Sequence, residues 1–296
     1  MSLRALTSLL AFLPLCLVGN VIAAKPNIIY ILADDAGIGD FGCYGGKIIQ
    51  TPNVDRLAAQ GMTFIQHYSG STVCAPSRSV LLTGQHTGRT RVRGNGAGAH
   101  LLDKDVTLTE VMQQAGYRTG CIGKWGLGGA ETAGAPWKQG VDHFFGFLSQ
   151  TRAHHYYPEY LYRNDKQVPF PNNPSERTNY CHDLFTSEAL TFIRDHQNQP
   201  FFLYLPYTIP HVDLDVPEDS KAPYKARFGE ETPYGKPGGQ HYRSESHPHA
   251  TFAGMLSRLD RDVGRLMALL AELDLEETTL VIFTSDNGAT SAGGAD

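Results

Sequence analysis

The sequence lacks the features that mark repeat proteins, low-complexity proteins and nucleic-acid-binding proteins. Its 296 residues contain no internal repeat, no low-complexity tract and no interdomain linker, so we expect one large domain. The formal charge of −5 gives no excess of positive charge, which argues against nucleic acid as a partner. Cysteine is also scarce: five are present, and their spacing does not show which of them, if any, would pair in a disulfide.

The longest apolar run lies at the amino terminus. Arg4 precedes the apolar residues 5–19, and the small residues Ala23 and Ala24 follow. This order is typical of a secretory signal peptide, and the run is too short for a membrane span with a stop-transfer flank. We therefore expect residues 1–24 to be removed and residues 25–296 to be exported, either secreted or periplasmic, with no membrane span.

The rest of the chain alternates strand and helix patterns. Residues 27–33 form a continuous apolar run, as expected of a strand buried on both faces. The alternation predicts an α/β fold with a mostly parallel central sheet and helices on both faces. The stretch 220–249, rich in Pro, Gly, Tyr and His without periodicity, is expected to be a surface excursion near the mouth of the site. Further strands are expected at residues 119–123, 200–205 and 279–284, and helices at 52–60, 76–83, 108–115, 183–197 and 252–270.

Residues 74–84 combine a helix pattern with reactive groups. Pro76 suits the first position of a helix, and Gly84 suits its end. Cys74 is therefore expected at or just before a helix amino terminus, where unpaired backbone N–H groups favour negative charge. Arg78 would lie in the first turn, the unfavourable end of the helix dipole for a cation, so we expect it to have an anionic partner.

Polar side chains follow four of the predicted strands. Ligands in open α/β sheets bind beyond the carboxyl ends of the strands, so these side chains are expected to converge with the helix that begins near Cys74. Asp, Asn and Gly also form ordinary turns, but four such strand ends together favour a site over four separate turns. The residues are Asp34 and Asp35 after the first strand, Lys124 after the second, His211 after the third, and Asp286 and Asn287 after the last.

Residues 74–84 match, without a mismatch, the signature Cys-x-Pro-Ser-Arg-x-x-Leu-Leu-Thr-Gly of the formylglycine-dependent sulfatases. The resemblance spans essentially all of residues 25–296 and implies the alkaline-phosphatase-like α/β fold. A buried, inert cysteine is one alternative for Cys74. A cysteine phosphatase is another, but it needs an arginine six residues later, where Val80 stands. Blocks at 27–35, 51–57, 123–125, 210–211 and 285–288 also resemble sulfatase blocks in family order.

The resemblance implies a cofactor and a role for each candidate residue. A separate maturation enzyme would oxidise Cys74 to the aldehyde formylglycine, whose hydrate is the nucleophile. Arg78 would orient and activate that hydrate, while Lys124 and His211 would contact the sulfate and assist the leaving group. A divalent cation, usually calcium in the family and with magnesium as the alternative, would be bound by Asp34, Asp35, Asp286, Asn287 and the modified Cys74.

The proposed metal ligands are chemically consistent with a hard divalent cation. Carboxylate and amide oxygens suit Ca²⁺ or Mg²⁺, whereas a thiolate selects softer metals. Oxidation of Cys74 to an aldehyde hydrate would make the metal shell all oxygen. The resemblance thus implies a sulfuric ester hydrolase acting on aryl sulfates or sulfated carbohydrates by nucleophilic catalysis, with the charge developing on oxygen stabilised by cations.

One position departs from the family pattern. Many members have a histidine at the position of Gly126, where it hydrogen-bonds the hydrate. His154 and His155 are candidates to replace it, and an ordinary surface-loop histidine is the alternative for each. A related phosphatase or phosphonate monoester hydrolase, and a non-catalytic secreted binding protein of the same fold, stay open as other functions. The sequence does not identify the sulfated substrate.

The chain ends soon after its last expected strand. Sulfatases of this kind continue to a second lysine that contacts the sulfate and to a smaller carboxyl-terminal domain. We therefore expect residues 25–296 to be a sulfatase catalytic domain that is truncated at its carboxyl end.

Overall fold

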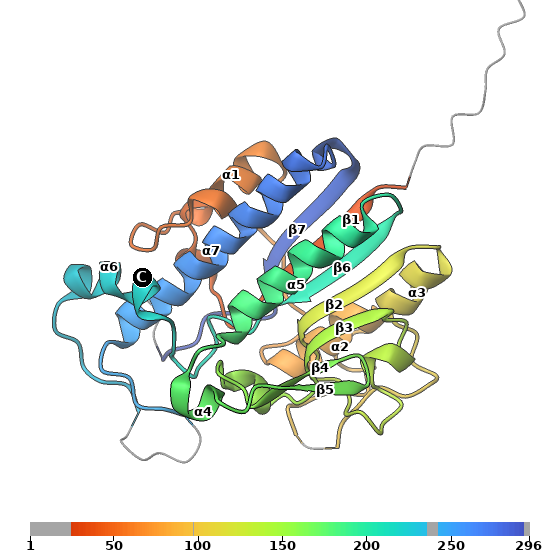
Figure 1. Cartoon of the computed structure of the whole chain (residues 1–296), viewed down its shortest axis with the longest axis horizontal. Helices are drawn as coiled ribbons and strands as arrows, with labels where there is room; N and C mark the ends of the chain where they lie inside the picture. Colours follow the sequence, from red (N-terminus) through yellow and green to blue (C-terminus); the bar gives the residue numbers. More distant parts are fainter. Residues whose placement is uncertain (1–24, 97, 236–241, 293–296) are drawn as a thin grey trace, which may run out of the picture.

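The computed structural model describes residues 25–96, 98–235 and 242–292; the expected signal peptide, residues 1–24, lies outside them. Seven strands form one sheet in the order β5-β4-β3-β2-β6-β1-β7 (Figure 1). The strands β3, β2, β6, β1 and β7 run parallel, and β4 and β5 are antiparallel at one edge. The strands are β1 (Asn27–Ala33), β2 (Arg118–Lys124), β3 (His143–Phe147), β4 (Tyr160–Arg163), β5 (Lys166–Pro169), β6 (Phe201–Pro206) and β7 (Thr279–Ser285).

Helices cover both faces of this sheet, as the alternating pattern predicted. In the described residues, none of them is both long and apolar enough to cross a membrane. The α-helices are α1 (Pro52–Gln60), α2 (Cys74–Thr83), α3 (Leu108–Gln114), α4 (Asn173–Glu176), α5 (Cys181–His196), α6 (Glu218–Phe228) and α7 (Pro248–Glu272). Short 3-10 helices are η1 (Ile38–Asp40), η2 (Gly42–Tyr44), η3 (Pro136–Lys138), η4 (Arg152–His154) and η5 (Glu276–Thr278).

The sheet separates two apolar cores. Alternate residues of a strand point to opposite faces, and β6 shows this directly. Leu203 and Leu205 pack in the core under α5 and α7. Phe202 and Tyr204 pack in the other core, which α2 and α3 cover. Because both faces of β6 are buried, its sequence is apolar throughout, and this is why a continuous apolar run predicted it.

Two expectations need correction, and three short strands were not predicted. The segment from residue 220 is not an irregular excursion throughout, because Glu218–Phe228 forms α6. This helix contains Pro223 and packs on α7, where the Tyr224 and Ser257 hydroxyls lie 2.6 Å apart. Pro76 is the third residue of α2 rather than the first. The strands β3, β4 and β5 were not predicted, since each has only four or five residues.

A buried carboxylate joins α1 to α7. The amino-terminal cap of α1, Thr51, makes no side-chain capping bond. Asp260 on α7 takes over this role, because its Oδ1 accepts the backbone N–H groups of Asn53 at 2.9 Å and Val54 at 2.8 Å. A helix amino terminus leaves N–H groups without intrahelical partners, so this contact satisfies two of them.

We predict that Asp260→Ala lowers the free energy of unfolding by about 1–3 kcal/mol, because two buried N–H groups lose their acceptor. Urea denaturation of the purified protein measures this as a lower midpoint. Glu272→Ala is the matched control on the same helix. Glu272 forms an exposed ion pair with Arg194 at 2.8 Å, and exposed ion pairs contribute little to the free energy of unfolding. Equal midpoints for the two variants would contradict a capping role for Asp260.

Candidate active site

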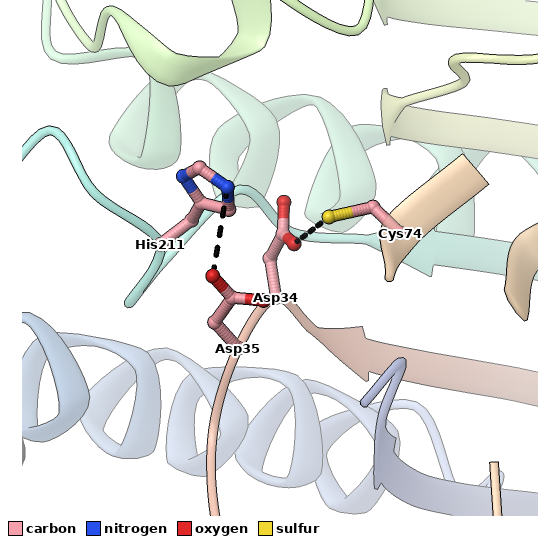
Figure 2. Close-up of side chains that lie close together, drawn as sticks. All are labelled: Asp34, Asp35, Cys74 and His211. Carbon is pink, nitrogen blue, oxygen red and sulfur yellow. Dashed lines mark hydrogen bonds and ion pairs between the residues drawn. The ribbon is translucent and has the colours of Figure 1, made fainter. Parts of the chain in front are cut away.

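The side chains expected from the strand ends meet beside the first residue of α2. Cys74 Sγ lies 3.2 Å from Asp34 Oδ1, just beyond β1. His211 Nε2, in the segment after β6, lies 3.5 Å from Asp35 Oδ2. Figure 2 shows these four side chains pointing toward one another, and one ligand atom from each lies within 4.8 Å of the others. The structure therefore brings together residues that lie as far as 177 positions apart in the chain, from Asp34 to His211.

Two buried cations hold the carboxylates of this cluster. Lys124, the last residue of β2, donates from Nζ to Asp34 Oδ2 at 2.6 Å. Arg78 donates from Nε and Nη2 to Asp286 Oδ2 at 3.1 and 2.8 Å, and its Nη2 lies 3.4 Å from Asp34 Oδ2. Both cations have no exposed surface. The anionic partners expected for Arg78 are therefore Asp34 and Asp286.

Further contacts fix the start of α2 against the ends of the strands. Arg78 Nη1 donates to the carbonyl oxygen of Lys124 at 3.0 Å, and the Ser77 hydroxyl donates to the carbonyl oxygen of Asp286. Asn95 Oδ1 accepts the backbone N–H of Ala75 at 3.0 Å, next to Cys74. Ser77 and Asn95 were not among the residues predicted from the sequence. Ser77 could have been found, because it belongs to the signature; nothing in the sequence singles out Asn95.

Asp35 and Asn287 form the outer part of the cluster. Asn287 Nδ2 donates to Asp35 Oδ1 at 2.5 Å, and the backbone N–H of Asp35 donates to Asp286 Oδ1 at 3.2 Å. Asp35 has a φ of 65°, a left-handed conformation that aspartate tolerates better than most residues. Asn287 Oδ1 is buried and has no hydrogen-bond partner among the described residues. A buried amide oxygen without a partner is costly, which indicates that something else binds there.

The carboxylates have strongly displaced pKa values. Burial opposes ionisation of Asp34, but Lys124 and Arg78 outweigh it and hold the pKa of Asp34 well below its usual range. Burial and then the charge of Asp34 raise the pKa of Asp286 to about 7. The same two causes raise the pKa of Asp35. The cluster therefore holds more carboxylate charge than its two buried cations can neutralise.

The environment of Cys74 is unsuited to thiolate chemistry. Burial, and then the negative charge of Asp34, raise the pKa of the Cys74 thiol far above its usual range. Reactive cysteines need the opposite environment, because the thiolate is the reacting form. Burial lowers the pKa of His211, whose Nδ1 donates to the carbonyl oxygen of Val212. This bond places the lone pair of the neutral imidazole on Nε2, which faces the cluster.

The residues present fit a hard divalent cation. Asp34, Asp35, Asp286 and Asn287 offer only oxygen donors, and the buried Oδ1 of Asn287 has no other partner in the described chain. The excess of carboxylate charge is the condition that a bound dication relieves. The Cys74 sulfur is the poorest match in the group, since hard cations prefer oxygen.

The region around Gly126 shows which of the two candidate histidines reaches the site. A Cβ atom at Gly126 would lie 2.2 Å from Gln150 Oε1, so Gln150 fills the space of a side chain at that position. His154 in η4 is buried and stacks on His211, with ring centroids 3.9 Å apart and planes 16° apart. His155 is half-exposed and lies 3.6 Å from Asp213. The structure thus brings His154 to the cluster and leaves His155 outside it.

A cavity of about 390 Å³ lies next to the start of α2. Ala75, Asn95, Gly126 and Gln150 line it, so it adjoins both the nucleophile position and the site of the missing histidine. Arg152, also on its wall, stacks over Tyr160 with 4.1 Å from the guanidinium carbon to the ring centroid. An aromatic ring and polar groups around a pocket of this size suit a small organic ligand.

Comparison with known proteins identifies the class to which this fold and site belong. The Sulfatase family profile matches residues 26–295, so the chain belongs to the sulfatase family. The sheet is accordingly the alkaline-phosphatase-like α/β fold that the resemblance implied.

The similarity extends to particular relatives. The chain is 34% identical to human arylsulfatase A over 91% of this chain and 53% of that protein. It is 30% identical to an N-acetylgalactosamine-6-O-sulfatase of Bacteroides thetaiotaomicron, over 89% of this chain and 59% of that one. The crystal structure of Ps i-CgsB in complex with k-i-k-neocarrahexaose superposes with a TM-score of 0.77 and 30% identity, over 92% and 60% of the two chains. The chain spans about half the length of the curated relatives it matches.

We predict that Ca²⁺ or Mg²⁺ raises the melting temperature of the protein, because a cation that binds only the folded state stabilises it by about 2.7 kcal/mol at 100 times Kd. Asp35→Asn is expected to abolish this rise, because it removes one ligand charge without breaking an Arg78 or Lys124 bond. Asp195→Asn, an exposed site on α5, is the matched control and should respond like the parent. Stabilisation by zinc alone would contradict an oxygen-rich site.

Proposed function

We propose that the protein is an exported sulfuric ester hydrolase that uses formylglycine at position 74 and a divalent cation. The carrying observation is the burial of Cys74 against Asp34, with the charge of Lys124 and Arg78 on the other oxygen of the same carboxylate. A thiol held protonated in this way is a poor nucleophile. Oxidation to an aldehyde by the maturation enzyme, followed by addition of water, would give the same position a hydrate hydroxyl as nucleophile, which the surrounding charges suit.

The chain's own residues would divide the work. Arg78, fixed by Asp286 and by the carbonyl oxygen of Lys124, would hold the nucleophile's oxygen in place. Lys124 would supply positive charge where negative charge develops on the sulfate oxygens. His211 presents Nε2 to the cluster and would donate a proton to the departing alcohol oxygen when the ring is protonated.

The proposed activity would require two groups that the unmodified chain lacks, formylglycine and a divalent cation. A formylglycine hydrate would supply the nucleophilic hydroxyl, and a bound Ca²⁺ or Mg²⁺ would add positive charge beside it. Asp34, Asp35, Asp286 and Asn287 would hold the cation. The oxidation of Cys74 would require contact with a maturation enzyme. The apolar residues 5–19 support export of the protein.

The proposed substrate is a sulfated carbohydrate or an aryl sulfate. One similar protein is named for a sulfated sugar, N-acetylgalactosamine-6-O-sulfatase, and another was crystallised with a neocarrahexaose. A third is named arylsulfatase A. The 390 Å³ cavity beside Ala75, with its Arg152–Tyr160 stack, has the size and polarity for a sugar ring.

The test of this proposal is co-expression with a formylglycine-generating enzyme. We predict that mass spectrometry of the peptide containing residue 74 shows the aldehyde or its hydrate. We also predict that the protein hydrolyses nitrophenyl sulfate faster than the matching phosphate. Cys74→Ala is the control and should show neither property. Activity in a preparation that retains the free thiol would overturn the formylglycine assignment, and a preference for phosphate would favour the related phosphatase.

A fourth prediction concerns the missing histidine at position 126. We infer that His154 takes its place, because it is buried and stacked on His211, whereas His155 is half-exposed. His154→Ala should lower kcat by about 10²–10³-fold, the usual effect of removing one donor from a charge-stabilising site. His155→Ala is the matched control and should leave kcat near that of the parent. The reverse order of effects would show that the assignment is wrong.

A further inference from the structure

A second depression lies at the opposite end of α2 from Cys74. It is a hollow of about 840 Å³ beside Gly84, the residue that ends the helix. Its walls carry five residues that are cationic or can become so, and one acidic residue. These are His86, Arg89, Arg91, Arg93, Lys104 and Asp105. We refer to this depression and its lining residues as the basic hollow.

The backbone directs three arginines to the same side. Thr90 and Val92 are each 1% exposed, whereas Arg89, Arg91 and Arg93 between and around them are exposed. All three arginines line the basic hollow, while the two residues between them are buried in the protein. The grouping of the three guanidinium groups therefore follows from the way the segment packs on the protein, through Thr90 and Val92.

The positive charge of the basic hollow is not neutralised by the protein. Within the described residues, Arg89, Arg91, Arg93 and Lys104 form no ion pair with a carboxylate. The one acidic residue, Asp105, accepts the backbone N–H of Leu102 at 2.9 Å. The whole chain has a formal charge of −5, so this concentration of positive charge is a local feature. Grouped cations repel one another, which indicates an anionic ligand.

Two of the arginines are held ready for a ligand. Arg91 Nε donates to the carbonyl oxygen of His100 at 3.0 Å, and Arg93 donates to the carbonyl oxygens of Thr90 and Gly88, both at 2.9 Å. These bonds orient the guanidinium planes and use only part of their five donors. The remaining donors suit the oxygen atoms of sulfate or phosphate groups, which arginine binds in bidentate fashion.

The basic hollow adjoins the cavity of the candidate active site. Arg93 lines the hollow, and the next residue, Gly94, lines the 390 Å³ cavity beside the nucleophile position. The ten residues of α2, about 15 Å of helix, separate Cys74 from Gly84. That distance is too long for the hollow to contact the sulfate that is cleaved. A longer ligand that extends out of the cavity along the protein surface would span the distance from Cys74 to the hollow.

We propose that the basic hollow is a binding site for sulfate groups other than the one that is cleaved, on the same carbohydrate chain. The choice of sulfated carbohydrate rests on the proposed function. The site would favour oligosaccharides with several sulfate groups over singly sulfated sugars. The cleaved sulfate would lie beside Cys74, and the unreacted part of the chain would pass over Gly94 to Arg89 and Lys104.

Binding and turnover test this proposal separately. The double variant Arg89→Ala/Lys104→Ala removes two exposed cations whose side chains form no hydrogen bond with the described residues. The control Arg56→Ala/Lys47→Ala removes the same charge from α1 and the segment before it, outside the hollow. The ligands are a carrageenan hexasaccharide, its desulfated form and a single-stranded DNA of equal charge. Calorimetry gives Kd for each, and melting temperatures confirm that every variant folds.

For the hexasaccharide, we expect the hollow variant to bind at least about tenfold more weakly than the parent, and the control variant to bind like the parent. The desulfated form should bind weakly to all three proteins. Hydrolysis of nitrophenyl sulfate should be equal in the three, because that substrate does not reach the hollow. Loss of hydrolysis in all three would overturn the proposed function and leave the binding result intact.

Three outcomes would overturn the inference. Hexasaccharide binding that is equal in the hollow variant and the parent would show that the hollow does not bind sulfate groups. An equal loss in the control variant would show a general charge effect. Tighter binding of the DNA, with the same dependence on Arg89 and Lys104, would assign the hollow to nucleic acid instead.

Discussion

The structure depends on the placement of a buried carboxylate, Asp34, between two buried cations. Taking such charges out of water costs several kcal/mol per ion, and good geometry with further hydrogen bonds is needed to offset it. Here Asp34 comes from the end of β1, Lys124 from β2 and Arg78 from α2. The register of β1 and β2 with the central strand β6, and the packing of α2 on the sheet, must all be correct for the charges to meet.

The same cluster explains why the site needs charge that the chain does not supply. Arg78 and Lys124 are already engaged by Asp34 and Asp286, and the pKa of Asp286 is raised to about 7. An anionic sulfate ester would meet a surface that is still rich in carboxylate oxygen. A divalent cation bound at the oxygen of Asn287, which is unpaired among the described residues, would reverse that balance. With such a cation in place, the carboxylates and the cation would act as one electrostatic unit.

The sequence predicted the parts of the fold and site that follow periodic patterns or a continuous motif. The strand at 27–33 is seen at the expected position. The helix of the Cys74 signature is present as well, and it begins at Cys74, two residues before the expected first residue Pro76. The short strands β3, β4 and β5 were not predicted, because four or five residues are too few to show a clear strand periodicity. The helix α6 was not predicted, because Pro223 lies inside it and a proline usually ends a helix. That the chain is a truncated catalytic domain stays a prediction.

The contacts that could not be predicted are those between irregular segments, and these contacts form the walls of the cavity beside Ala75. Gly126 and Gln150 illustrate the reason: the empty space at one position is filled by a side chain 24 residues later, and neither residue belongs to a motif. The chemical groups, in contrast, stand at strand ends, where sheet geometry determines their positions. A motif can therefore identify the reaction class. The proposed substrate choice would depend on the walls of the cavity and of the basic hollow, whose packing only the structure shows.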